Sequence, residues 1–261
     1  MSMPFFLPAD DPGPSFSNLL QRMGHNPLPD PGMAVPVTHA TTCVAMRLAD
    51  GVVMAGDRRA TSGNLISHRA MEKVFPADRH SGIAIAGAAG PAMEMVKLFQ
   101  LQLEHYEKVE GGELSLDGKA NQLSQMVRSN LPAAMQGLVV VPIFAGYDTL
   151  RHQGRLFDYD VTGGRYEERD YVATGSGSLH AGTVIRVGYR EGLSRDEALD
   201  LCVKALWVAA DNDSATGGPD PLRGIYPTVA TITARGFERV SDDELAGRFE
   251  AVAEQERGVI Q

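Results

Sequence analysis

The order of strand-like and helical segments constrains the fold of this chain more than any other feature of its sequence. Apolar periodicity predicts strands over residues 41–48, 52–57, 83–86, 138–145, 155–159, 166–173 and 228–233. It predicts two helices after the third strand, one that ends near residue 106 and one over residues 121–136. Two more helices are predicted before the last strand, the second opening with a capping box at residues 194–197, and one from residue 242 onward. Because strands and helices come in groups instead of alternating, the pattern predicts an α+β fold in which helix pairs pack on antiparallel sheets.

The first 40 residues differ from the rest of the chain in their proline content. They contain eight of the 15 prolines, and the remaining 221 residues share the other seven. No Lys or Arg precedes Arg22, and the one early apolar cluster is interrupted by Pro8, so a secretory signal peptide is not expected. We therefore expect a Pro-rich leader that ends where a strand begins at Thr41, and a cytoplasmic location.

Composition excludes several classes of protein. The formal net charge of −9 disfavours a nucleic-acid-binding role, and no apolar run approaches the roughly 18 residues of a membrane span. No phosphate-loop or dinucleotide-binding pattern lies between a strand and a helix. The two cysteines, Cys43 and Cys202, lack the spacing of a zinc site and are expected to be buried, reduced thiols.

Thr41 stands at the junction of the leader and the first strand. A threonine hydroxyl is a poor nucleophile until a base accepts its proton. Cleavage after Ala40 would free an α-amino group with an ordinary pKa of about 7.7–8, which could be that base. Asp57 and Lys73 are candidates for the charged pair that would tune such a site. Spacing alone favours simpler interpretations, in which Thr41 is an ordinary strand residue and Asp57 and Lys73 are solvated surface charges or an ordinary ion pair.

A resemblance to a known family adds weight to the catalytic interpretation. The motif residues lie at 41–45, 51–59, 73, 85–89, 175–178 and 213–218, in order along the chain. Together they resemble the β subunits of proteasomes from about residue 41 to residue 234. The stretches 103–108 and 219–227 resemble the actinobacterial branch of that family. The resemblance implies a four-layer αββα sandwich of the N-terminal nucleophile hydrolase type, with two antiparallel sheets between helix pairs.

The same resemblance implies roles for individual residues. Thr41 would be the N-terminal nucleophile, so residues 1–40 would be a propeptide removed by autolysis and residues 41–261 the catalytic domain. Lys73 would lower the pKa around the nucleophile, and Asp57 would be its carboxylate partner. The bond cleaved would join Ala40 to Thr41, although the family usually has Gly at the position of Ala40.

Further residues match the surroundings of the nucleophile. Ser176, Asp213 and Thr216 match the polar group around the terminal amine, and Thr216 stands where many relatives have Ser. Ser178 lies two residues after Ser176, so which of the two serines supports the nucleophile stays open. Gly87 matches the residue whose N–H stabilises the oxyanion of the tetrahedral intermediate.

Substrate contacts and partners are also implied. Thr61 and Ala89 would bind the substrate main chain, and an apolar pocket that favours apolar side chains before the scissile bond would be lined by Ala60, Met71, Phe75, Ile85 and Met93. No metal or organic cofactor is required. The family forms homo-heptameric β rings stacked on α-subunit rings. An AAA ATPase ring feeds in unfolded substrates, which in actinobacteria carry a ubiquitin-like tag.

Two other functions fit parts of the pattern. The chain could be another N-terminal-nucleophile peptidase or amidase, such as the simpler bacterial ATP-dependent type, although those subunits are generally shorter and lack a long leader. It could instead be a non-catalytic structural ring subunit. The joint presence of Thr41, Asp57 and Lys73 argues against the structural role, which has no need of all three.

Overall fold

The computed structural model describes residues 41–260, which build two five-stranded antiparallel sheets. The strands of the first sheet, in spatial order, are β10 (Tyr171–Gly175), β1 (Thr42–Arg47), β2 (Gly51–Gly56), β11 (Thr228–Thr233) and β12 (Gly236–Arg239). Those of the second sheet are β5 (Val74–Asp78), β6 (Ser81–Gly87), β7 (Val140–Asp148), β8 (Gln153–Tyr159) and β9 (Arg165–Glu168). A separate hairpin pairs β3 (Ala60–Ser62) with β4 (Leu65–His68).

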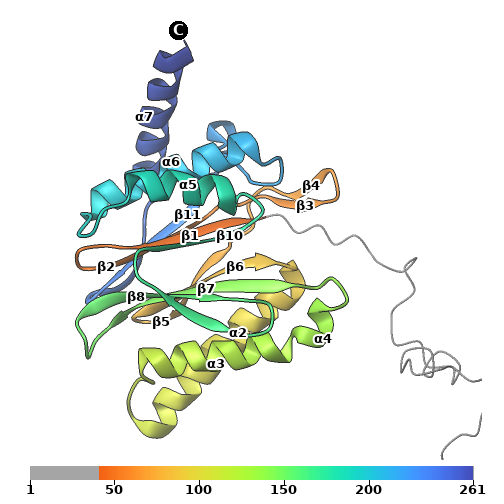
Figure 1. Ribbon diagram of the computed structural model, residues 1–261, viewed down its shortest axis with the longest axis vertical. Coiled ribbons are helices and arrows are strands. Elements are labelled where there is room, and N and C mark those ends of the chain that lie inside the picture. Colours follow the sequence, from red (N-terminus) through yellow and green to blue (C-terminus); the bar gives the residue numbers. More distant parts are fainter. Residues whose placement is uncertain (1–40, 261) are drawn as a thin grey trace, which may run out of the picture. The chain divides into compact units, whose positions relative to one another are not determined.

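Helices cover the outer face of each sheet, which gives the predicted αββα order of layers (Figure 1). The first sheet carries α5 (Ser178–Gly188) and α6 (Arg195–Asn212), and the second carries α2 (Ala89–Glu110) and α3 (Leu116–Ser129). The remaining helical segments are α4 (Leu131–Ala134), η2 (Pro221–Arg223) and α7 (Asp242–Ile260). None of the helices formed by residues 41–260 is long and apolar enough to cross a membrane.

Strand β1 shows why the layers form. Val44 and Met46 belong to the apolar cluster under α5 and α6, whereas Cys43 and Ala45 belong to the cluster between the two sheets. Successive side chains of a strand point to opposite faces, so a strand that is apolar throughout is buried on both sides. A third cluster fills the space between the second sheet and helices α2 and α3.

Several predicted elements are confirmed with small shifts. The strands predicted near residues 41–48, 52–57 and 228–233 are β1, β2 and β11, and the terminal helix is α7. Helix α6 opens with the predicted capping box, in which Ser194 and Glu197 each bond the other's backbone. Both Cys43 and Cys202 are buried free thiols.

Two predicted boundaries are wrong. The single strand predicted over residues 166–173 is two strands in different sheets, because the chain bends at residues 169–170 and crosses from β9 to β10. The helix predicted over residues 121–136 begins earlier, where the Ser115 hydroxyl accepts a hydrogen bond from the Gly118 N–H. It ends at Ser129, and the short α4 follows with Pro132 near its start.

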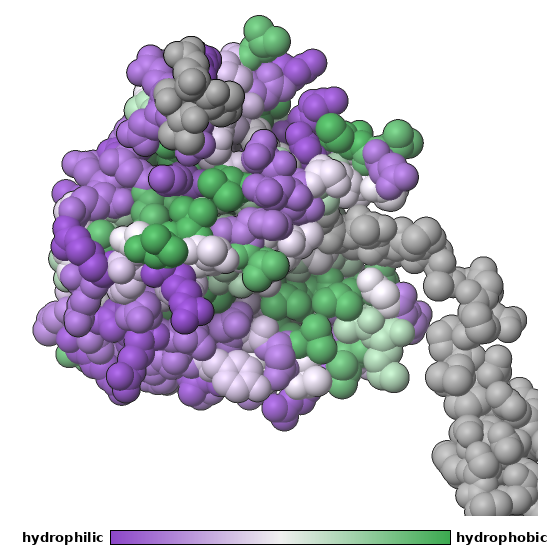
Figure 2. All heavy atoms as spheres, turned by 45° about the horizontal axis from the view of Figure 1, so that its top comes forward, coloured by the Kyte–Doolittle hydropathy of each residue, from purple (hydrophilic) through white to green (hydrophobic). Residues whose placement is uncertain are grey.

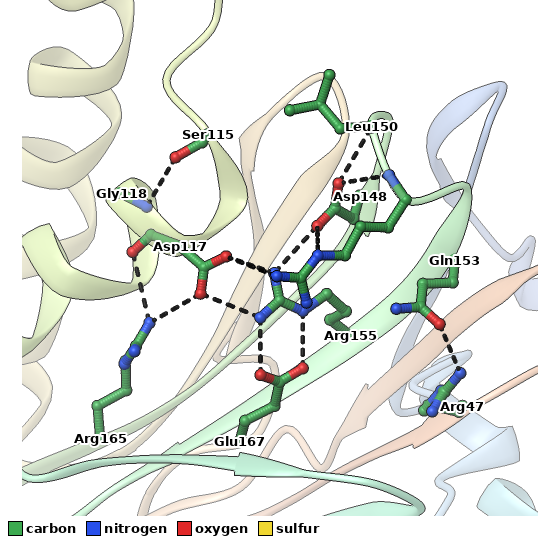
Figure 3. A network of polar contacts seen from close by, with 11 residues as sticks. Arg47, Ser115, Asp117, Gly118, Asp148, Leu150, Gln153, Arg155, Arg165 and Glu167 are labelled. Atoms are coloured by element: carbon green, nitrogen blue, oxygen red, sulfur yellow. Dashed lines mark hydrogen bonds and ion pairs between the residues drawn. The ribbon is translucent and has the colours of Figure 1, made fainter.

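Polar contacts around Arg155 fasten α3 to the second sheet (Figure 3). Its guanidinium donates two hydrogen bonds to Asp117 of α3, two to Glu167 of β9 and one to Asp148 at the end of β7. All five N–H groups of the arginine are therefore used. The guanidinium carbon also lies 5.0 Å from the ring centroid of Phe157.

Candidate active site

Thr41 lies directly before β1 and is 5% exposed. Its carbonyl oxygen accepts a hydrogen bond of 2.8 Å from the N–H of Ser176, which follows β10. Gly175 makes this approach feasible: its φ is +95°, and a Cβ there would lie 1.8 Å from the Thr41 oxygen. The start of β1 and the end of β10 are thus fixed against each other at Thr41.

Asp57 and Lys73 form a buried ion pair beside this point. Lys73 Nζ lies 2.6 Å from Asp57 Oδ1, and the two side chains are 1% and 0% exposed. Lys73 precedes β5 and also donates to the Arg59 carbonyl at 2.6 Å. A buried charge is costly unless it is paired and hydrogen-bonded, so the structure excludes the surface ion pair that spacing alone allowed.

The Asp57 carboxylate accepts hydrogen bonds from four chain segments. Oδ1 accepts from the N–H of Thr42 at 2.8 Å and from Lys73, and Oδ2 accepts from the N–H groups of Arg59 at 2.9 Å and Gly217 at 2.8 Å. These bonds satisfy both oxygens and fix the lysine relative to the start of β1. They also connect the ion pair to the loop after α6.

Asp213 accepts hydrogen bonds from the hydroxyl groups of Ser176 and Thr216, the two residues that the family resemblance groups with it around the terminal amine. Ser176 Oγ donates to Asp213 Oδ2 at 2.5 Å, and Thr216 Oγ1 donates to the same oxygen at 2.6 Å. Burial pushes the pKa of Asp213 upward, but the hydrogen bonds from Ser176, Thr216 and the Ala215 N–H outweigh it and lower the pKa. Ser178 begins α5, so of the two serines it is Ser176 that joins this group.

Gly87 ends β6 at the turn into α2. Its φ is +117°, and a Cβ there would lie 2.0 Å from the Val139 carbonyl oxygen. The N–H of Ala88 donates to that same oxygen at 2.7 Å. Only glycine fits this backbone, because any side chain would clash with the Val139 carbonyl.

The predicted substrate-contacting residues lie in four places. Ile85 on β6 is a buried member of the apolar cluster between the second sheet and helices α2 and α3, and Phe75 on β5 and Met93 on α2 pack against that cluster. Ala60 and Thr61 lie on β3, where the pairing with β4 is irregular, and Ala89 is the first residue of α2. Met71 is half-buried, and its N–H donates to the Arg58 carbonyl at 3.0 Å. Ala40 lies outside the described residues.

Thr42 and Arg59 lie within the family motifs at residues 41–45 and 51–59, but the resemblance assigned neither residue a role. Thr42 is fully buried, and its hydroxyl lies 2.6 Å from that of Thr216. The Arg59 guanidinium donates to the Ser214 carbonyl at 2.9 Å, in the loop that carries Asp213. The sequence did hold a signal for both residues, because Thr42 directly follows Thr41 and Arg59 lies two residues after Asp57.

Within residues 41–260 no group of three or more His, Cys, Asp or Glu side chains could hold a metal ion.

Comparison with known proteins agrees with this geometry. The sequence profile of a family described as "Proteasome subunit" matches residues 37–220. The chain belongs to the proteasome subunit family. It is 57% identical to a proteasome subunit beta of Acidimicrobium ferrooxidans over 94% of this chain and 91% of the relative. It is 60% identical to one of Streptomyces griseus over 85% of this chain and 79% of the relative. A proteasome subunit beta of Jonesia denitrificans is 56% identical over 83% and 72% of the two chains.

The family match covers every element that carries the candidate site. The residues matched begin before β1 and end after the loop that holds Asp213, Thr216 and Gly217. The resemblance given by the sequence motifs is therefore confirmed, and so is the expected α+β sandwich.

Proposed function

We propose that this chain is the catalytic β subunit of a bacterial proteasome core, a threonine endopeptidase that cleaves unfolded, tagged proteins. The observation that carries the proposal is the fully buried Asp57–Lys73 pair, bonded through the Thr42 N–H to the residue next to Thr41. A structural subunit gains little from burying a lysine, because an apolar replacement is often as stable. A reaction that needs a fixed cation beside a hydroxyl gives a reason for its presence.

The proposed reaction uses Thr41 as both nucleophile and base. Its α-amine accepts the hydroxyl proton, Oγ1 attacks the substrate carbonyl, and an ester to the enzyme forms as the amine product leaves. Water activated by the same amine then hydrolyses the ester. Lys73 would stabilise the developing negative charge at Oγ1, and the Gly87 N–H would donate to the oxyanion, a bond typically worth on the order of 100- to 1,000-fold in rate.

Activation would follow from the same chemistry. In the precursor the Thr41 nitrogen is an amide, so a water molecule would act as base while Oγ1 attacks the Ala40 carbonyl. The attack breaks the C–N bond between Ala40 and Thr41 and so frees the amine, and hydrolysis of the resulting ester then releases residues 1–40. We therefore assign residues 1–40 as a propeptide that keeps the peptidase inactive and residues 41–261 as the catalytic domain.

Specificity is proposed from the apolar residues near the site. Phe75, Ile85 and Met93 share one apolar cluster, which supports a chymotrypsin-like preference for apolar side chains before the scissile bond. Thr61 and Ala89 would hold the substrate main chain as an added strand. Ala60 and Met71 would complete the pocket.

Assembly into homo-heptameric β rings with α-subunit rings is proposed from the relatives' name and from the surface. Figure 2 shows apolar areas on a face that is otherwise largely hydrophilic. On α5, Leu179 is 74% exposed and Val187 is 85% exposed, and contact with a neighbouring subunit would bury these apolar side chains. An AAA ATPase ring would act through the α rings, and the assembly would be cytoplasmic.

Peptide hydrolysis tests the proposal. Assembled particles from the full chain and its α subunit are given fluorogenic peptides that place Phe, Arg or Glu before the scissile bond. We expect the Phe peptide to be cleaved fastest, Thr41→Ser to retain part of the activity and Thr41→Ala to have none. Hydrolysis that survives Thr41→Ala would contradict the assignment of the nucleophile. Equal rates for the three peptides would contradict only the specificity.

A further inference from the structure

The hydroxyl of Thr42 lies at the centre of the polar contacts behind the candidate nucleophile. Thr42 is the first residue of β1 and has no exposed surface. Its Oγ1 accepts a hydrogen bond from the Gly177 N–H at 3.1 Å and lies 2.6 Å from Thr216 Oγ1. One side chain thus joins β1 to the turn after β10 and to the loop after α6.

The direction of each hydrogen bond follows from the number of protons available. A threonine hydroxyl has one proton to donate. Thr216 donates its proton to Asp213 Oδ2 at 2.6 Å, so in the contact between the two hydroxyls Thr42 is the donor. The chain of donors therefore runs from the Gly177 N–H through Thr42 and Thr216 to the Asp213 carboxylate. Each bond in such a chain polarises the next, and the last one is strengthened by the charge.

The surrounding backbone is shaped around this hydroxyl. A Cβ on Gly177 would lie 2.3 Å from Thr42 Oγ1 and 2.7 Å from Thr216 Oγ1, so glycine is required for the N–H to reach its acceptor. The Thr42 N–H meanwhile donates to Asp57 Oδ1 at 2.8 Å. Thr42 is consequently bonded to both carboxylates of the site, to Asp57 through its N–H and to Asp213 through the Thr216 hydroxyl.

We propose that Thr42 is a positioning residue for the proposed peptidase reaction. Its hydroxyl holds Thr216 and Asp213 in the arrangement that orients the Thr41 amine as base. This inference rests on the proposed function. It assigns to Thr42 no contact with substrate, since the residue is fully buried and acts through its neighbours.

A positioning role has a kinetic signature that a purely structural threonine lacks. Removal of the hydroxyl should lower kcat and leave KM nearly unchanged, because substrate binds elsewhere. It should also move the acid limb of the kcat/KM profile to lower pH. A carboxylate held close to an amine favours the protonated amine, and a less constrained Asp213 would favour it less.

Isosteric substitution separates the two roles. Thr42→Val removes the hydroxyl at nearly constant volume, and Thr42→Ser retains it. Thr228→Val is the matched control, because Thr228 is also buried and its hydroxyl has no hydrogen-bond partner within residues 41–260. Assembled particles are assayed for peptide hydrolysis over pH, and intact mass gives the fraction of chains that begin at Thr41.

We expect Thr42→Val to lower kcat per processed chain by roughly 10- to 100-fold, as for loss of one or two hydrogen bonds near charge. Thr42→Ser and Thr228→Val should stay within about threefold of the wild type. If Thr42→Val does not assemble, Thr42→Ala, which leaves space for a water molecule, should show a smaller loss of kcat in the same direction.

Three results would overturn the inference. If the wild type is active and Thr42→Val has the same kcat and pH profile, the inference is refuted and the proposed function stands. Equal losses in Thr42→Val and Thr228→Val would show general destabilisation of the core and would also refute it. A processed and assembled wild type that hydrolyses no peptide would refute the proposed function, and this inference with it.

Discussion

Two buried cations, Lys73 and Arg155, lie at opposite ends of the second sheet and use their hydrogen-bond donors differently. Lys73 packs beside the end of β6, where the Ile85 N–H donates to its carbonyl, whereas Arg155 pairs with Gly146, opposite the start of β6. Arg155 donates all five of its N–H groups to three carboxylates (Figure 3). Lys73 donates two of three, to Asp57 and Arg59, within residues 41–260.

The difference separates a structural ion cluster from a candidate catalytic one. The Arg155 guanidinium stabilises the packing of α3 on the sheet and has no free N–H donor with which to bind a substrate. A lysine held by one carboxylate and one carbonyl retains one N–H donor and its positive charge. The carboxylate partners differ as well, since Asp57 is fully buried and Asp117 and Glu167 are 42% and 46% exposed.

The largest expected effect is on activity at Lys73. Lys73→Met should lower kcat/KM for peptide hydrolysis by roughly 100- to 10,000-fold, as for loss of a group that stabilises the transition state. Asp57 keeps three backbone N–H donors, so the variant should still fold, with a loss in unfolding free energy of up to about 3–5 kcal/mol. The assay is hydrolysis by assembled particles. Activity within tenfold of the wild type would contradict a role for the remaining donor.

At Arg155 the expected effect is on stability. Arg155→Met should lower the unfolding free energy by about 3 kcal/mol, toward the lower end for breaking a buried ion pair, because Asp117 and Glu167 can regain water. The kcat per folded chain should change less than twofold. Arg151→Met is the control, since Arg151 is 56% exposed and lies 3.9 Å from Asp117. It should cost less than about 1 kcal/mol in denaturant unfolding. Equal losses in both variants would refute the distinction.

Acid should weaken the Arg155 cluster selectively. Hydrogen bonds from Arg155 lower the pKa of Asp117 below its usual 3.8 and that of Glu167 below its usual 4.5. A lowered carboxyl pKa contributes stability above the unfolded-state value, and that contribution is lost as pH falls through the folded-state value. The stability difference between wild type and Arg155→Met should therefore narrow below about pH 4.5. Denaturant unfolding at several pH values measures it, and a constant difference would contradict the assignment.

The smallest expected effect is on the reactivity of the two buried thiols, Cys43 and Cys202. Burial raises the pKa of Cys43 and of Cys202 to about 12, although Lys73 opposes the rise at Cys43. Neither thiol should react with iodoacetamide at pH 8 in the folded protein, and both should react after unfolding. Mass spectrometry of the alkylated protein checks this. Selective reaction of Cys43 would show that the core beside Lys73 opens to solvent.

Local patterns in the sequence predicted the elements whose signals lie within a few residues. The continuous apolar run of β1, the capping box at Ser194 and the late strand at 228–233 are of this kind. The β9–β10 crossover was missed because the predicted strand ran through four consecutive charged residues, 167–170, at which β9 ends and the chain bends into β10. Strand β5 was missed because it contains Pro76, which an edge strand tolerates.

The candidate site was located through family motifs and not through periodicity. The motifs selected Thr41, Asp57 and Lys73, and the structure brings Asp57 and Lys73 together in one buried pair. The motifs also placed Thr216 and Asp213 in one polar group, but no sequence pattern linked Thr42 to them or predicted the Arg155 cluster. The Thr42–Thr216 and Arg155–Asp117 contacts join residues distant in sequence and exist only after the sheets have formed.

The central claim is that Thr41 becomes the N-terminal nucleophile, and intact mass tests it most directly. The full chain is purified in assembled particles with its α subunit, as wild type and as Thr41→Ala. We predict that the wild type begins at Thr41, and that the variant keeps the leader that precedes residue 41. A wild type that keeps its leader in the assembled particle, or a Thr41→Ala variant that is cleaved after Ala40, would contradict the claim.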